Sequence, residues 1–241
     1  MTLLEQDKAT ASLVGQPVAT SEPEKPSQEV VSKRKQADEE ISSSRLTKIA
    51  RSISLIFHPF LVSPLAIVLI LWLDQGRLAS AIGWAGLCAA FVVAPGMIYL
   101  RRKLTQKEFT DADVSVQEHR YGFYLFGAAC MIICFLVLIW LKAPTILIVS
   151  FTAALVSLVA AAIINRYWTK ISIHTGTMAG VTVLAGYYSW PLAIALGLGV
   201  LAVSWARLVT KRHTLQQAIL GWLIAGICVF GTVEVGFRLM G

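Results

Sequence analysis

Apolar residues dominate the chain from about residue 52 onward, in seven long runs separated by short polar segments. Most runs reach the ~20 residues that an α-helix needs to cross a bilayer. None alternates apolar and polar residues in the way that a membrane β-barrel requires. The pattern therefore predicts an all-α, polytopic bundle of about six to seven transmembrane helices. We expect these helices at 52–73, 79–100, 121–141, 144–164, 171–187, 190–207 and 214–236.

The fifth and sixth predicted helices share one apolar run, interrupted only by the segment from Tyr187 to Pro191. Tyr and Trp favour the membrane interface, and proline suits the first turn of a helix. The interruption therefore predicts two short helices joined by a tight turn.

The first part of the chain has a different character. Residues 1–48 are rich in Ser, Glu, Lys, Gln and Pro, a composition typical of disorder. The segment lacks the apolar stretch behind a basic start that marks a secretory signal. We expect a disordered polar tail over 1–48 and a membrane domain over 49–241.

Composition narrows the function classes. Hydrophobic residues make up 56% of the chain and charged residues only 15%, against roughly 25% in soluble domains. These values exclude a soluble enzyme, a collagen, a coiled coil and a disulfide scaffold. The four cysteines lie inside apolar runs, so we interpret them as packing residues.

The net charge of +7 belongs entirely to the apolar part of the chain, because residues 1–51 carry eight acidic and eight basic side chains. The loops at 101–120, 165–170 and 208–213, together with Arg207, carry ten Lys and Arg. The loops on the other side carry three. The positive-inside rule predicts that these ten cationic residues and the N-terminal tail lie on the cytoplasmic side of the membrane. That membrane would be the cell (inner) membrane or an internal membrane.

Unusual polar residues gather at the same helix ends. The 101–120 loop ends in Glu118-His119-Arg120, and the fifth predicted helix begins with Lys170-Ile-Ser-Ile-His174. Ionisable groups at membrane depth are costly, so they indicate a functional site by default. Elsewhere we expect ordinary roles: a kink or packing feature for His58, a solvated loop position for His119, and loop structure with arginine pairing for Asp111, Asp113 and Glu118.

Three ordered motifs resemble those of the type 2 phosphatidic acid phosphatase and vanadium haloperoxidase superfamily. Arg207-x5-His213-x3-Gln217 is similar to its Ser-Arg-x5-His-x3-Asp motif, and Ser172-Ile173-His174 to its Pro-Ser-Gly-His motif. Arg120 corresponds to the arginine of its Lys-x6-Arg-Pro motif. A further likeness is to bacterial members with Asp-Val-x5-Arg before the third helix, as in Asp113-Val114 to Arg120.

The resemblance implies a helical phosphatase core and a metal-independent reaction without a cofactor. His213 would be the nucleophile that forms a phosphohistidine, and His174 the acid that protonates the leaving alcohol. Gln217 would orient His213. Arg120 and Arg207 would bind the phosphate and stabilise its transition state, with help from Ser172 and Lys170. The implied ligand is a lipid or isoprenoid phosphate met in the membrane, not a nucleic acid.

The chain also departs from the family pattern. Gln217 replaces the aspartate that follows the nucleophile, Asp113 stands where the first-motif lysine is expected, and Ala206 replaces the motif serine. Lys103, Lys107 and Lys170 are candidates to replace the lysine. Two alternatives therefore stay open: a catalytically weak or inactive relative that binds lipid phosphate or a partner subunit, and a membrane prenyltransferase, which would need acidic motifs in two loops and bound Mg²⁺.

Overall fold

The computed structural model describes residues 45–111, 113–114 and 116–240. The predicted tail over 1–48 lies outside the described residues except for its last four, which begin the first helix. Within the described residues every regular element is helical. In chain order these are α3 (Arg45–Ile56), α4 (Pro59–Gln75), α5 (Leu78–Cys88), the π-helical turn η1 (Ala89–Val93), α6 (Ala94–Thr105), α7 (Gln117–Trp140), α8 (Thr145–Tyr167), α9 (Ile173–Gly186), α10 (Trp190–Val209) and α11 (Leu215–Met240).

All seven predicted apolar segments are helical, and five helices of the described part are long and apolar enough to cross a membrane. They are Leu78–Thr105, His119–Trp140, Thr145–Tyr167, Trp190–Val209 and Leu215–Leu239. The first predicted segment is a pair of helices, α3 and α4, bent by 46° at Phe57-His58, which makes up to six spans if the pair counts as one. The fifth segment, α9, has 14 residues, or about 21 Å, which is short of the hydrocarbon core.

Local sequence explains the breaks. The side chain of His58 caps α4 by accepting a hydrogen bond from the Phe60 N–H, and Pro59 follows in the first turn. Gly76 ends α4 in the left-handed conformation, at φ 68°. The π-helical turn η1 precedes Pro95, whose missing N–H and ring disturb the regular helical ladder. The predicted turn at 187–191 is confirmed, because α9 ends at Gly186 and Ser189 caps α10.

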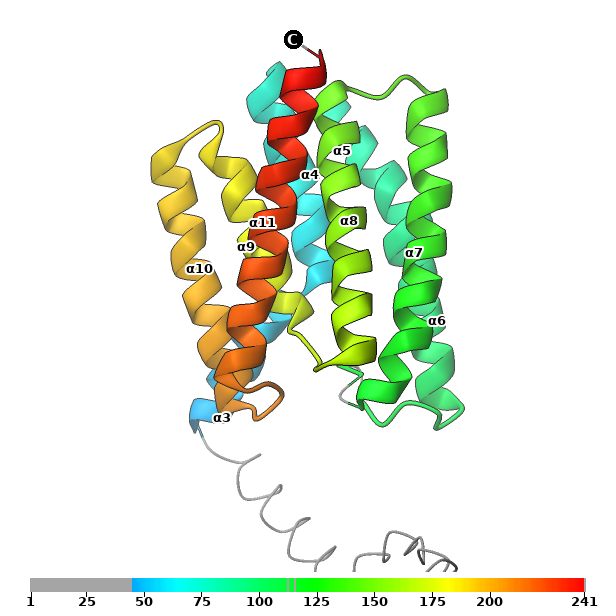
Figure 1. Ribbon diagram of the computed structural model, residues 1–241, viewed down its shortest axis with the longest axis vertical. Helices are drawn as coiled ribbons and strands as arrows, with labels where there is room; N and C mark the ends of the chain where they lie inside the picture. The colour runs from blue at the N-terminus through cyan, green and yellow to red at the C-terminus, as the bar shows by residue number, and fades with distance from the viewer. Residues whose placement is uncertain (1–44, 112, 115, 241) are drawn as a thin grey trace, which may run out of the picture. The chain divides into compact units, whose positions relative to one another are not determined.

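Helix α9 lies at the centre of the bundle, in contact with α4, α10 and α11 (Figure 1). Nine of its fourteen residues are buried, which explains why so short an apolar helix is stable there. Helix α11 approaches it so closely that a Cβ on Gly221 would lie 2.5 Å from Thr175 Oγ1 and 2.7 Å from the Ser172 carbonyl oxygen. A glycine at 221 therefore allows α11 to pack against the start of α9.

The polar segments between helices meet at one end of the bundle. The beginnings of α4, α7 and α9 and the end of α10 all contribute residues to a single small cavity there. The C-terminal end of α11 lies at the opposite end (Figure 1). The fold thus brings together residues that are up to 155 positions apart in the sequence, from His58 to His213.

Candidate anion-binding site

A cavity of about 70 Å³ holds the polar residues of this end, and we call it the anion pocket. At the 10–15 Å³ that one water requires, it has room for about five water-sized atoms, which is the number of heavy atoms in a phosphate. Two cationic side chains, one carboxylate and three imidazoles line it. Its lining is His58, Pro59, Phe60, Leu100, Asp113, Val114, Arg120, Phe123, Ile173, His174, Arg207 and His213.

Arg120 is buried, with 3% of its surface exposed, and its guanidinium holds the site together. It donates hydrogen bonds to the carbonyl oxygens of Val114 at 2.7 Å, Ile171 at 2.8 Å and Asp113 at 3.3 Å. These bonds tie the 106–116 loop to the segment before α9. A guanidinium has five N–H donors, and these three bonds leave it with further donor capacity.

Arg207 is equally buried, at 2% exposed, and carries one ion pair. Its Nη1 donates to Asp113 Oδ1 at 3.1 Å, while its Nε has no hydrogen-bond partner in the described protein. Asp113 also pairs with Arg212, at 3.4 Å. A buried donor without a partner costs free energy, so Arg207 retains the capacity to bind an anionic oxygen. The predicted arginine pairing of Asp113 is confirmed.

Gln217 holds His213 in one tautomer. Its Oε1 lies 3.2 Å from His213 Nδ1 and also accepts a hydrogen bond from the Thr214 N–H. Because an oxygen cannot donate, Nδ1 of His213 carries the proton, and its Nε2 keeps the lone pair. His213 lies in the loop two residues before α11 and Gln217 lies in the first turn of α11, so this contact joins the loop to the start of the helix.

His213 also lies in surroundings that keep it neutral. Its side chain is buried, and burial lowers its pKa to about 2, with further lowering by the charges of Arg120, Arg207 and Lys170. A neutral imidazole with a free Nε2 next to two arginines has the protonation state that a nucleophile needs. The cations that disfavour imidazolium at His213 would also attract a phosphate.

Two further histidines line the anion pocket as a pair. His174 lies in the first turn of α9, and its ring is 5.0 Å from that of His58 in an edge-on arrangement. His58 Nδ1 is occupied as the N-cap acceptor of α4, so Nε2 is its remaining nitrogen. The expected kink at His58 is confirmed, but the sequence analysis did not predict that His58 also lines the pocket. The helix break at an X-Pro pair was the signal that could have placed it near a functional site.

Ser172 and Lys170 do not line the anion pocket. Ser172 is 1% exposed, and its Oγ caps α9 by accepting a hydrogen bond from the Thr175 N–H, at 3.4 Å. Lys170 is half-buried, and its pKa is lowered by burial and by the nearby charge of Arg120. Its charge acts on the anion pocket from outside the lining, because it is one of the causes that lower the pKa of His213. The predicted direct contacts of both residues with phosphate stay predictions.

The other polar and titratable side chains that the sequence singles out, where the structure describes them, do not line the anion pocket. The ring of His119 stacks on Phe109, with centroids 5.6 Å apart, and does not line the pocket. Lys103 pairs with Glu108. The four cysteines are free, and all lie within helices. Among the described residues no three His, Cys, Asp or Glu side chains are grouped as metal ligands.

No protein-family model, no curated protein and no solved structure matches this chain. The assignment of a function therefore rests on the residues of the anion pocket and on their chemistry.

Proposed function

We propose that the chain is an integral membrane phosphatase that hydrolyses a phosphate monoester or pyrophosphate on a lipid or isoprenoid. One observation carries the proposal: Arg120, His174, Arg207 and His213 line a single cavity of about 70 Å³. The four residues come from the three motifs that resemble the phosphatase family, and they lie in α7, α9, α10 and the loop between α10 and α11. Their meeting around a phosphate-sized space is what phosphoryl transfer requires.

The reaction begins with the substrate phosphate between the two arginines. His213 Nε2 attacks phosphorus, and the bond from phosphorus to the leaving oxygen breaks. His174, which takes up a proton when the phosphate dianion binds beside it, gives that proton to the leaving oxygen. The molecule released is an alcohol, or a prenyl monophosphate if the substrate is a prenyl diphosphate. Water then attacks the phosphohistidine, passes a proton to His174, and inorganic phosphate leaves.

The arginines supply the electrostatic part of catalysis. Charge spreads over the equatorial oxygens in the transition state, and buried cations stabilise it strongly because water is excluded. The anion pocket holds two arginines and one carboxylate, so it has a net positive charge when its histidines are neutral. The first N–H groups of α9, next to His174, add the positive end of a helix dipole.

Gln217 limits the rate in this scheme. Its amide orients His213 but cannot offset the positive charge that develops on the imidazole during attack. In the serine protease triad, changing the comparable aspartate to asparagine costs ~10⁴ in turnover. The second candidate function is a protein that binds lipid phosphate without hydrolysing it. Two observations favour it: the residue that orients His213 is the neutral Gln217, and the Asp113 carboxylate already pairs with Arg207.

The location of the pocket supports an amphiphilic substrate. The pocket lies at one end of a bundle whose outer surface is apolar, so molecules with a phosphate head and a hydrocarbon tail reach it from the bilayer. The Lys and Arg of three loops lie at this end, so the positive-inside rule predicts that the pocket faces the cytoplasm.

The test is phosphate release by the purified protein in detergent from phosphatidate, prenyl phosphates and prenyl diphosphates. The variant His213→Ala removes the nucleophile, and His119→Ala is the matched control, because His119 lies outside the anion pocket. We expect release by the wild type and by His119→Ala but not by His213→Ala. Equal rates for the wild type and His213→Ala would refute the proposal.

A further inference from the structure

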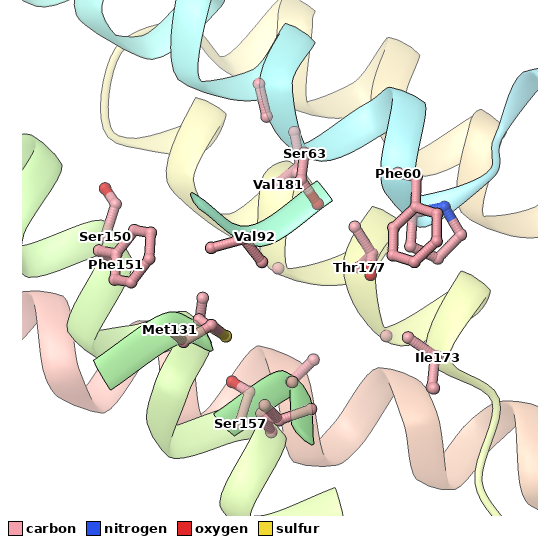
Figure 2. A pocket seen from close by; sticks show the side chains of 18 of the residues that line it. Phe60, Ser63, Val92, Met131, Ser150, Phe151, Ser157, Ile173, Thr177 and Val181 are labelled. Atoms are coloured by element: carbon pink, nitrogen blue, oxygen red, sulfur yellow. The ribbon is translucent and has the colours of Figure 1, made fainter. Parts of the chain in front are cut away.

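A second, larger cavity of about 320 Å³ lies inside the bundle, and we call it the apolar chamber. Helices α4, α7, α8, α9 and α11 and the η1 turn surround it. Its lining is almost entirely carbon, with Phe60, Val92, Met131, Phe151 and Val181 among the side chains that face it (Figure 2). A space this apolar is suited to hydrocarbon, not to a polar metabolite.

The apolar chamber adjoins the anion pocket. Four residues line both cavities: Pro59, Phe60, Phe123 and Ile173. Figure 2 shows Phe60, Thr177 and Ile173 at one end of the chamber and Ser150 and Phe151 at the other. A tail attached to a phosphate in the anion pocket would therefore begin next to the chamber, with only these shared side chains between the two cavities.

The length of the apolar chamber fits one leaflet of a bilayer. On α4 its lining extends from Pro59 to Leu71, a rise of twelve residue steps or about 18 Å along the helix axis. This is slightly more than half of the ~30 Å hydrocarbon core. A tail with its head at the membrane surface would reach about this far.

The volume of the apolar chamber limits how many hydrocarbon chains it can hold. An engineered protein cavity of ~150 Å³ accommodates benzene, with six carbons, and the apolar chamber is about twice that size. By this comparison the chamber holds roughly ten to fifteen carbons. Two acyl chains of ordinary membrane lipids contain more than twice as many.

We propose that the apolar chamber is a tail-binding site for a single hydrocarbon chain, so the preferred ligand is a single-chain lipid phosphate and not a diacyl one. The inference rests on the proposed function only in placing the phosphate head in the anion pocket. The chamber acts through burial, so affinity rises with chain length until the chamber is full. Each methylene transferred from water adds about fourfold, the equivalent of ~0.8 kcal/mol.

The experiment uses a variant that fills the chamber and a matched control on the same helix. Ala154 lines the chamber on α8, and a phenyl ring there removes roughly half of the space. Val156 is 44% exposed on the outside of α8 and does not line it. We therefore compare Ala154→Phe with Val156→Phe. Ser157→Leu, a smaller change at a lining residue, replaces Ala154→Phe if that variant does not fold.

The probes are butylphosphonate and dodecylphosphonate, which cannot be hydrolysed, measured by ligand-induced thermal stabilisation in the same detergent. The phosphonates partition into detergent micelles to the same extent for every variant, so this partition cancels when the affinities of two variants are compared. We expect Ala154→Phe to lose at least tenfold in affinity for dodecylphosphonate and less than twofold for butylphosphonate. Val156→Phe should match the wild type for both probes. Equal losses for both chain lengths, or no loss for either, would overturn the proposal.

Three further outcomes test the tail-binding proposal, and the first two distinguish it from the hydrolase proposal. If dodecylphosphonate binds as expected but no substrate releases phosphate, the hydrolase proposal fails and the tail site stands. If phosphate is released at rates that Ala154→Phe leaves unchanged for short and long chains, the tail site fails and the hydrolase stands. Dioleoyl phosphatidate that binds tenfold more tightly than dodecylphosphonate, and loses that gain in Ala154→Phe, would refute the limit of one chain.

Discussion

Asp113 provides the sharpest quantitative prediction, because it is an internal anion in a pocket that we assign to phosphate. Its carboxylate pairs with Arg207 at 3.1 Å and with Arg212 at 3.4 Å. Bound phosphate would compete for the same donors and be repelled by the same charge. Asp113→Asn keeps the shape and one acceptor oxygen but removes the charge.

The magnitude follows from the ion pair with Arg207. At 3.1 Å and an effective dielectric constant of 20, the Coulomb attraction is about 5 kcal/mol, most of which desolvation offsets. The net value of a hydrogen bond to a charged group is ~1.5–3 kcal/mol. Releasing Arg207 from Asp113 should therefore tighten phosphate binding about tenfold to a hundredfold, since 1.4 kcal/mol is a factor of ten. Without phosphate, the variant should be less stable by ~1–3 kcal/mol, because a buried guanidinium loses its counter-charge.

The assay is thermal unfolding of the detergent-solubilised protein with increasing inorganic phosphate, since a ligand that binds the folded state stabilises it in proportion to RT ln(1 + [L]/Kd). Asp111→Asn is the matched control: Asp111 lies in the same loop and pairs with Arg212, which is more exposed than Arg207. We expect Asp113→Asn to begin less stable and to gain more from phosphate than the wild type or Asp111→Asn. Equal or weaker phosphate binding by Asp113→Asn would refute the competition between carboxylate and phosphate.

Three further predictions test the nucleophile and the helix packing. Gln217→Asp should raise the rate of phosphate release at least tenfold, because a carboxylate offsets the charge that develops on His213, and an unchanged rate in a steady-state assay would contradict that role. Burial lowers the pKa of His213 in the folded protein to about 2, whereas in the unfolded chain it stays near 6.5. Below pH 6.5 only the unfolded chain therefore binds a proton at His213. The free energy of unfolding falls as a result by about 1.4 kcal/mol for each pH unit below 6.5. His213→Gln should remove this component, which thermal unfolding at pH 5.5 and 7.5 would reveal as a smaller difference between the two pH values. Gly221→Ala should destabilise the protein by ~2 kcal/mol or more, since its Cβ would meet Thr175 and the Ser172 carbonyl, whereas Gly226→Ala, with nothing within 4 Å, should be neutral in the same unfolding measurement.

Much of the fold could be predicted from hydropathy, because lipid leaves few structures open to a long apolar run. The helices, the turn after Gly186 and the contact between His213 and Gln217 all follow from local sequence. The central, buried position of α9 could not be predicted, because burial depends on its contacts with α4, α10 and α11 and not on its own apolar content. The continuous helix over α5, η1 and α6 was predicted as one segment, but the π-helical turn before Pro95 was not, because hydropathy does not report local changes in helix geometry.

The candidate site could be predicted only in part. Arg120, His174, Arg207 and His213 are placed at helix ends by the sequence pattern, and the structure brings them to one cavity. The sequence predicts a kink or packing feature at His58, and the kink is present as the 46° bend between α3 and α4. The position of His58 in the pocket was not predicted, because spacing alone does not show which residues a bend brings together. The apolar chamber is a property of tertiary packing, and nothing in the hydropathy of single helices reveals a void between them.

The most direct test of the central claim is a structure of the protein with orthovanadate, which adopts the five-coordinate geometry of phosphoryl transfer. The account predicts vanadium at covalent bonding distance from His213 Nε2, with equatorial oxygens on Arg120 and Arg207 and an apical oxygen facing His174. Vanadate bound elsewhere, or an anion pocket in which Asp113 remains on Arg207 at saturating vanadate, would contradict it.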